Sequence, residues 1–193
     1  MPIIAERNKK VNPKTRQKRT LYVVTMGLLS AILLIGQVGM AFLPNIEPVT
    51  FLIIIYTLVY GRQVFFIIYA FVLVEGLIYG FGIWWVSYLY IWSILAILTM
   101  ILKKNQSPVI WAVIAGAYGL MFGALCAVPY LISGGIGAAF AYWTAGIPYD
   151  ILHCIGNFGI TLVLYKPVLS VLKTLHTSQL SITDDRHKTI HLS

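Results

Sequence analysis

An uninterrupted apolar run at residues 21–43 decides the fold of this chain: LYVVTMGLLSAILLIGQVGMAFL. At about 1.5 Å per residue, a helix of this length spans the roughly 30 Å hydrocarbon layer of a membrane. A secretory signal peptide has an apolar core of only about 7–15 residues and a small-residue cleavage site. Here the run is longer and is followed by Pro44 and Asn45. We therefore predict a transmembrane helix over 21–43.

The composition of the whole chain also indicates a membrane protein. Of its 193 residues, 59% are hydrophobic and only 10% are charged, and the mean hydropathy is +0.84. A soluble domain has about 25% charged residues, so this chain has too few polar side chains to cover a water-exposed surface. This excludes a soluble enzyme, a disordered chain and a disulfide-stapled secreted domain. Cys126 and Cys154 fall inside apolar runs and are expected to be small buried residues.

Five further helices are predicted along the chain. The run 49–60 is short for a span, so we expect other helices to cover its sides. The run 63–102 is too long for one span and is interrupted at Gly80-Phe81-Gly82. A Gly-rich loop is expected at 133–137. The remaining helices are predicted at about 63–80, 85–102 and 108–132, and from near Pro148 to about Lys166 or beyond.

Positive charge decides the predicted orientation. All 14 Lys and Arg residues fall before residue 20, at Arg62, at Lys103 and Lys104, or at and after Lys166. Six spans put all of these positions on one side, whereas five or seven spans would divide them. Because Lys and Arg accumulate in cytoplasmic loops, both termini are predicted to be cytoplasmic. The predicted organisation is a basic arm at 1–20, an all-α bundle of six transmembrane helices at 21–175 and a polar tail at 176–193.

Ionisable side chains mark the opposite, external side. Glu47, Glu75, Asp150 and His153 lie in or beside the spans near their predicted outer ends. Ionisable residues inside a membrane are costly and usually functional. Two interpretations stay open for them. They bind a solute, or they pair with one another to hold the helices together.

The sixth helix carries a polar stripe. Asp150, His153, Asn157 and Thr161 are spaced 3, 4 and 4 residues apart, which places them on one helical face. A polar face on a lipid-embedded helix is expected to point into the protein, where Gln37 of the first helix can join it.

Aromatic residues concentrate at the same external end. An interfacial belt is the ordinary explanation, but a belt populates both membrane faces, and the inner face has far fewer aromatic residues. The asymmetry favours a stacking site for a solute that contains a ring. The predicted substrate-binding residues are Glu47, Glu75, Tyr79, Trp84, Trp85, Trp143, Asp150, His153 and Asn157.

Small residues at four-residue spacing form two further features. Gly27 and Ala31 make such a pair on the first helix, where docking of a partner protein is the sharper interpretation. The stripe on the fifth helix is expected to serve internal packing; it comprises Ala115, Gly119, Gly123 and Ala127.

Catalytic and cofactor motifs give no support for an enzyme. The chain contains no H-E-x-x-H, G-x-S-x-G or Walker A sequence, and a bis-histidine haem would need a second intramembrane histidine beside His153. No cofactor and no metal are predicted. Two alternatives to a solute-binding protein remain: a membrane scaffold or assembly protein, and an intramembrane enzyme using Asp150 and His153.

The chain resembles the S component, the substrate-binding subunit, of energy-coupling factor (ECF) vitamin transporters. The resemblance covers about residues 21–175 and rests on six spans in about 190 residues with a basic N-terminal arm. Four segments complete the pattern: GLLSA at 27–31, LPNIEPVT at 43–50, YGFGIWW at 79–85 and AGIPYD at 145–150.

The resemblance implies partners and a location. In the family an A-x-x-x-A pair on the first helix docks the S component onto a transmembrane coupling subunit, and two ATPase subunits power uptake. That docking role would fall on Gly27 and Ala31, with glycine in place of the first alanine. The resemblance also implies a bacterial plasma membrane and a vitamin bound between the external loops and the outer helix ends.

The class of solute follows from charge. The predicted external half contains no Lys or Arg, whereas an anionic vitamin would normally need a cationic partner. Glu47, Glu75 and Asp150 favour a cation or a hydrogen-bond donor. The predicted solute is therefore a neutral or cationic ring compound, such as thiamine or its pyrimidine, a cobalamin-type corrinoid, or a nucleoside or deazapurine precursor.

Overall fold

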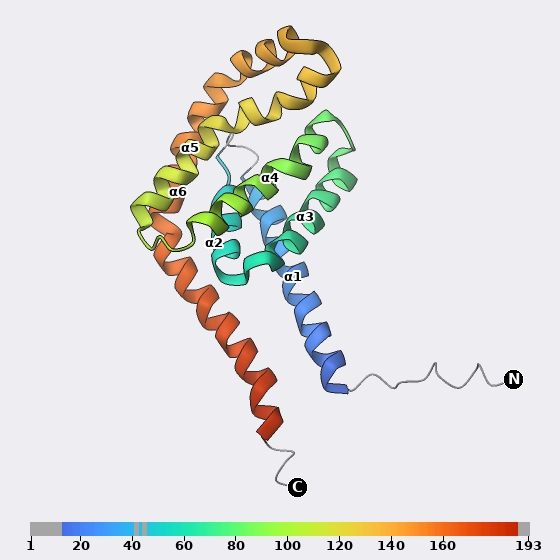
Figure 1. Ribbon diagram of the computed structural model, residues 1–193, viewed down its shortest axis with the longest axis vertical. Helices are drawn as coiled ribbons and strands as arrows, with labels where there is room; N and C mark the ends of the chain where they lie inside the picture. Colours follow the sequence, from blue (N-terminus) through green and yellow to red (C-terminus); the bar gives the residue numbers. More distant parts are fainter. Residues whose placement is uncertain (1–12, 41–42, 44–45, 189–193) are drawn as a thin grey trace, which may run out of the picture.

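The computed structural model describes residues 13–40, 43 and 46–188. Every element within these residues is helical, and they contain no β-strand, so the prediction of an all-α protein is confirmed. The elements in Figure 1 are α1 (Pro13–Gly39), α2 (Val49–Tyr60), the short 3-10 helix η1 (Gly61–Gln63), α3 (Val64–Tyr79), α4 (Ile83–Leu102), α5 (Pro108–Cys126) and α6 (Val128–Lys188).

Within the described residues, five helical segments are long and apolar enough to cross a membrane. Their mean hydropathies lie between 1.5 and 2.1, which is typical of lipid-embedded helices, and together they suggest a multi-pass membrane protein. The segments are Arg16–Gly39, Val49–Tyr79, Ile83–Leu102, Pro108–Cys126 and Val128–Gln179.

The segment Val49–Tyr79 contains a sharp turn. Gly61 has a φ of +56°, a left-handed conformation that glycine adopts without steric cost, and α2 and α3 leave this turn in different directions (Figure 1). The short helix α2 is enclosed, because it contacts α1, α3, α4, α5 and α6, and Ile53, Ile54 and Ile55 have no exposed surface. The expectation that other helices cover α2 is therefore confirmed.

Helices α5 and α6 form a close hairpin. A Cβ atom on Gly119 would lie 2.8 Å from the His153 carbonyl oxygen, and one on Gly123 would overlap the Asp150 carboxylate. Helices in lipid gain little hydrophobic free energy by associating, so close backbone packing of this kind holds them together. At these two positions the small-residue stripe of the fifth helix serves internal packing, as predicted.

The structure differs from the sequence prediction between residues 127 and 147. The predicted loop is almost entirely helical, and the chain reverses at Gly135, which has a φ of +75° inside the span of α6. One glycine is enough to make this reversal. The following residues 136–147 are mostly apolar and include several alanines, the best helix former, so the helix resumes at once.

Both terminal regions are more helical than their polar composition suggested. Helix α1 begins at Pro13, inside the predicted basic arm, and α6 continues through the predicted tail to Lys188. Residues 13–20 contain Lys, Arg and Gln, which are good helix formers, so there the loss of the apolar pattern marks the end of a span and not the end of a helix. The remaining parts of the predicted arm and tail, 1–12 and 189–193, lie outside the described residues.

The helices have two chemically distinct ends. The N-terminal half of α1, η1, the α4–α5 connection and the C-terminal half of α6 lie toward one end in Figure 1, here named the basic end. These segments carry every Lys and Arg whose side chain is described: Arg16, Lys18, Arg19, Arg62, Lys103, Lys104, Lys166 and Lys173. The opposite end, here named the acidic end, carries Glu47, Glu75 and Asp150.

Candidate functional site

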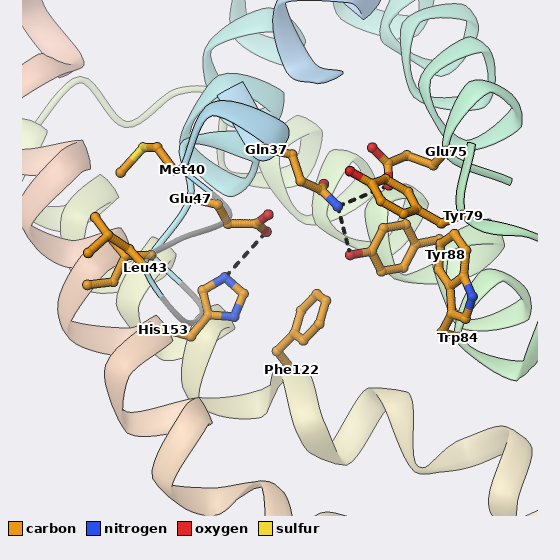
Figure 2. Close-up of a pocket in the computed structure, with 11 residues that line it drawn as sticks. Gln37, Met40, Leu43, Glu47, Glu75, Tyr79, Trp84, Tyr88, Phe122 and His153 are labelled. Carbon is orange, nitrogen blue, oxygen red and sulfur yellow. Dashed lines mark hydrogen bonds and ion pairs between the residues drawn. The ribbon is translucent and has the colours of Figure 1, made fainter. Parts of the chain in front are cut away.

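A cavity of about 400 Å³ opens at the acidic end, between α1, α3, α4, α5 and α6. This volume falls in the range of about 300–1,000 Å³ that is typical of small-molecule sites. The described residues that line it include neither Lys nor Arg. The lining residues, most of which are labelled in Figure 2, are Gln37, Met40, Leu43, Ile46, Glu47, Glu75, Tyr79, Trp84, Tyr88, Phe122 and His153.

Glu75 on α3 supplies the most deeply buried carboxylate of this cavity. Its side chain is 1% exposed, and its Oε2 atom accepts a hydrogen bond from Gln37 Nε2 at 3.1 Å. Gln37 Nε2 also lies 3.5 Å from the Tyr88 hydroxyl oxygen. The other oxygens of the pair, Glu75 Oε1 and Gln37 Oε1, are buried and have no hydrogen-bond partner among the described residues. A buried polar atom left unpaired costs about 1–3 kcal/mol, so both oxygens favour a ligand that donates hydrogen bonds.

Glu47 and His153 form a second polar group in the same cavity. Glu47 precedes α2, His153 lies on α6, and His153 Nε2 is 3.8 Å from Glu47 Oε1. Within the part of the chain that the structure describes, neither ring nitrogen of His153 has a hydrogen-bond partner, although the side chain is almost fully buried. Figure 2 shows this pair on one side of the cavity and the Gln37–Glu75–Tyr88 group on the other. A solute between them could contact both groups.

Aromatic side chains form much of the remaining wall. Trp84 and Tyr88 lie one helical turn apart on α4 and meet edge to face, with ring centroids 5.3 Å apart. Phe122 on α5 lies against both Tyr88 and His153, at centroid distances of 6.4 and 4.8 Å. Aromatic faces beside carboxylates suit a flat ring that carries positive charge or N–H donors.

Five of the nine predicted substrate-binding residues therefore line this cavity: Glu47, Glu75, Tyr79, Trp84 and His153. Two predicted tryptophans lie outside it. Trp85 donates a hydrogen bond from Nε1 to the Val72 carbonyl oxygen at 2.9 Å and packs against Phe81, so it joins α4 to α3. Trp143 is exposed on α6, where it packs against Phe140.

The polar stripe of α6 faces the protein interior, as predicted, because Asp150, His153, Asn157 and Thr161 are all at most 3% exposed. The residues of this stripe nevertheless do not all line the same cavity. Asp150 lines a neighbouring cavity of about 390 Å³, where its Oδ1 accepts a hydrogen bond from the Gly123 backbone N–H at 2.9 Å. Asn157 lines neither cavity and packs against Gly119. Asp150 and His153 form no hydrogen bond with each other.

Tyr88 and Phe122 are the main lining residues absent from the predicted set. Tyr88 had a usable signal, because it follows Trp84 by four residues and so shares its helical face. No feature of the sequence pointed to Phe122, because it is one apolar residue inside an apolar helix. Met40, Leu43 and Ile46 complete the wall from the segment between α1 and α2.

Glu47 is expected to make binding of a cationic solute depend on pH. Burial, and to a lesser extent the charge of Glu75, raises the pKa of Glu47 to about 7. Above this pKa the carboxylate is ionised and attracts a cation; below it the neutral acid does not. Affinity for a cationic ring compound should therefore fall as the pH decreases from about 8 to about 6. Titrations of wild type and Glu47→Gln test this. An equally steep pH dependence in the variant would show that another group is responsible.

Comparisons with known proteins leave the family of this chain open. No protein-family model, no curated protein and no solved structure matches it. The function is therefore argued from the cavity, its charge and the arrangement of the helices.

Proposed function

We propose that this protein is the substrate-binding S component of an ECF-type importer in a bacterial plasma membrane. It captures a neutral or cationic ring-containing vitamin or related micronutrient at the external face, and partner subunits drive uptake with ATP. The observation that carries this proposal is the cavity at the acidic end, with two carboxylates, aromatic walls and no Lys or Arg among its described lining residues.

The proposed topology has six crossings with both termini in the cytoplasm. It counts α2 and α3 separately, because the turn at Gly61 divides the 31-residue segment Val49–Tyr79. The distribution of basic residues supports this orientation, since cytoplasmic loops accumulate Lys and Arg. The cavity lies at the opposite end of the bundle and would therefore face outward.

The lining residues favour one class of solute. Glu75 and Glu47 offer negative charge and acceptor oxygens, while Trp84 and Tyr88 offer ring faces and edges. A carboxylate vitamin would meet these two acids without a Lys or Arg to pair with. The volume of about 400 Å³ suits thiamine, its pyrimidine, or a nucleoside-sized ring better than a corrinoid macrocycle, which is several times larger.

The structure gives less support to the two alternative functions, an intramembrane enzyme and a membrane scaffold. An intramembrane enzyme built on Asp150 and His153 would need the two groups to act on one substrate, but they line different cavities. A scaffold without a solute would leave the unpaired buried oxygens of Glu75 and Gln37 unexplained.

The proposed docking surface for the coupling subunit lies on α1. Gly27 and Ala31 are both exposed, and a Cβ atom on Gly27 would meet nothing within 4 Å. Such a flat patch lets the backbone of another helix approach closely. A bulky side chain at either position would therefore block the approach of a partner helix without disturbing the fold.

Gly27→Leu is expected to abolish solute uptake and to leave solute binding by the purified protein unchanged. The added side chain would hold the coupling subunit away from α1 but lies far from the cavity. Uptake is measured in vesicles that contain the coupling subunit and both ATPases, and binding by titration in detergent.

Gly137→Leu is the matched control, because Gly137 is also an exposed helical glycine with open space at its Cβ position. It lies on α6, away from the proposed docking surface, and should transport normally. Normal uptake by Gly27→Leu would overturn the docking assignment. Loss of binding in Gly27→Leu would show instead that the substitution disturbs the solute site.

A further inference from the structure

A third cavity, of about 400 Å³, lies at the basic end between the α4–α5 connection and α6. Three lysines line it: Lys103 from the connection, and Lys166 and Lys173 from α6. The two α6 lysines are seven residues apart and so lie two turns apart on one helical face. Two separate parts of the chain thus bring positive charge to one hollow.

A buried hydrogen-bond donor lines the same cavity. Asn105 Nδ2 is buried and has no hydrogen-bond partner in the described part of the chain. The rest of this residue is fixed, because Asn105 Oδ1 accepts a hydrogen bond from the Ser107 N–H at 3.1 Å and its carbonyl oxygen accepts one from Trp111 Nε1 at 3.1 Å. The connection is therefore held in place while one amide donor stays available for an acceptor that is not part of the chain.

No carboxylate side chain that the structure describes lines this cavity. The carboxylates with described side chains are Glu47, Glu75 and Asp150 at the acidic end, and the ion pair found among the described side chains joins Glu47 to His153. The connection also leads into the N-terminus of α5, whose helix dipole adds partial positive charge. Three lysines and an unpaired amide donor around one hollow favour an anion with several acceptor oxygens.

We propose that this cavity binds the phosphate of an anionic phospholipid headgroup. Lys103 directly follows α4, the span Ile83–Leu102, so the cavity lies at the level where an apolar span ends. Leu58 and Leu169 line it beside the lysines and would contact the first carbons of the acyl chains. Basic pockets between transmembrane helices at the cytoplasmic interface are known to hold anionic headgroups. The inference rests on membrane embedding and is independent of the proposed solute.

Native mass spectrometry of the purified full chain tests the site. Phosphatidylglycerol or phosphatidylcholine is added in detergent, and the retained lipid is counted. The wild type is expected to retain one phosphatidylglycerol in preference to phosphatidylcholine. Lys103→Gln/Lys166→Gln/Lys173→Gln should weaken this retention by about tenfold or more.

A charge-matched variant distinguishes specific binding in this cavity from non-specific attraction of anionic lipid to a basic surface. Arg16→Gln/Arg19→Gln/Arg62→Gln removes three positive charges from the same end but none from the cavity, so it should retain phosphatidylglycerol within about twofold of wild type. Equal losses in both triple variants would overturn the site. Asn105→Asp keeps the acceptor for Ser107 and replaces the free donor by a negative oxygen. It should lose retention as well, and wild-type retention by this variant would overturn the role of Asn105.

The source of the phosphate is decided by competition. Pyrophosphate in millimolar excess should leave bound phosphatidylglycerol in place, because the soluble anion lacks the acyl chains that Leu58 and Leu169 contact. Displacement of the lipid by pyrophosphate, or binding of pyrophosphate without any retention of phosphatidylglycerol, would overturn the lipid assignment in favour of a soluble phosphate compound.

Discussion

Glu75→Gln is expected to lower the affinity for a cationic ring solute by about 10- to 150-fold, the equivalent of losing one hydrogen bond to a charged group. Glu75 is almost completely buried, its Oε2 is already bonded to Gln37, and its Oε1 is unpaired. The substitution keeps the shape of the side chain and the acceptor for Gln37. It removes the negative charge and replaces one oxygen by an N–H donor. Titration of the purified protein measures the change in affinity.

Two further variants make this result specific. Glu75→Asp retains the charge and should recover part of the affinity. Asp150→Asn makes the same carboxylate-to-amide change in the neighbouring cavity and should have a smaller effect than Glu75→Gln. A larger loss from Asp150→Asn would place the solute in the cavity that Asp150 lines. Unchanged affinity in both amide variants would contradict a solute held by buried carboxylates.

Gly119→Leu is expected to lower the free energy of unfolding strongly, because α5 and α6 meet at Gly119 with no room for a side chain. Even a Cβ atom would lie 2.8 Å from the His153 carbonyl oxygen and 2.9 Å from Asn157 Nδ2. Overpacking of this kind typically costs about 1–3 kcal/mol, and a leucine adds three more carbons. The thermal midpoint in detergent should fall by about 5 °C or more.

The control for this experiment is Gly27→Leu, which adds the same side chain where nothing lies within 4 Å. Its thermal midpoint should remain near that of wild type. Since α6 carries His153 into the cavity, Gly119→Leu should also weaken solute binding. A Gly119→Leu protein as stable as Gly27→Leu would show that the two helices are not packed as closely as described.

Much of the helical framework could be predicted because the sequence marks it with local signals. Pro48 and Gly61 bracket the apolar run that becomes α2, and Gly80 and Gly82 separate α3 from α4. The inward face of α6 followed from the spacing of its polar residues. These features depend on backbone chemistry and helical periodicity, which act within a few residues.

The reversal near Gly135 was harder to predict. Several glycines and a serine in 133–137 indicated a long loop, but only Gly135 leaves the helical conformation. A glycine permits a turn without requiring one, so the number of residues in the turn depends on how the flanking helices pack. Here α6 resumes directly and packs along α5, which the local composition could not reveal.

Which side chains line the cavity depends on how each helix is rotated about its own axis, and local sequence does not determine this rotation. Asp150 and His153 are three residues apart on one face of α6, yet they line different cavities because Phe122 lies at the boundary between them. Trp84 and Trp85 are adjacent, and only Trp84 lines the cavity. Neighbouring residues on a helix point about 100° apart, so a small rotation decides which of them reaches a ligand.

Titration of intrinsic tryptophan fluorescence with a panel of neutral, cationic and anionic vitamins is the decisive test of solute binding in the cavity at the acidic end. Trp84 lines the cavity, so a bound ring should change its emission, and Trp84→Phe should lose most of that change while four tryptophans remain. We expect saturation by one neutral or cationic ring compound at a 1:1 ratio. Tightest binding of a carboxylate vitamin, or no response to any neutral or cationic ring compound, would contradict it.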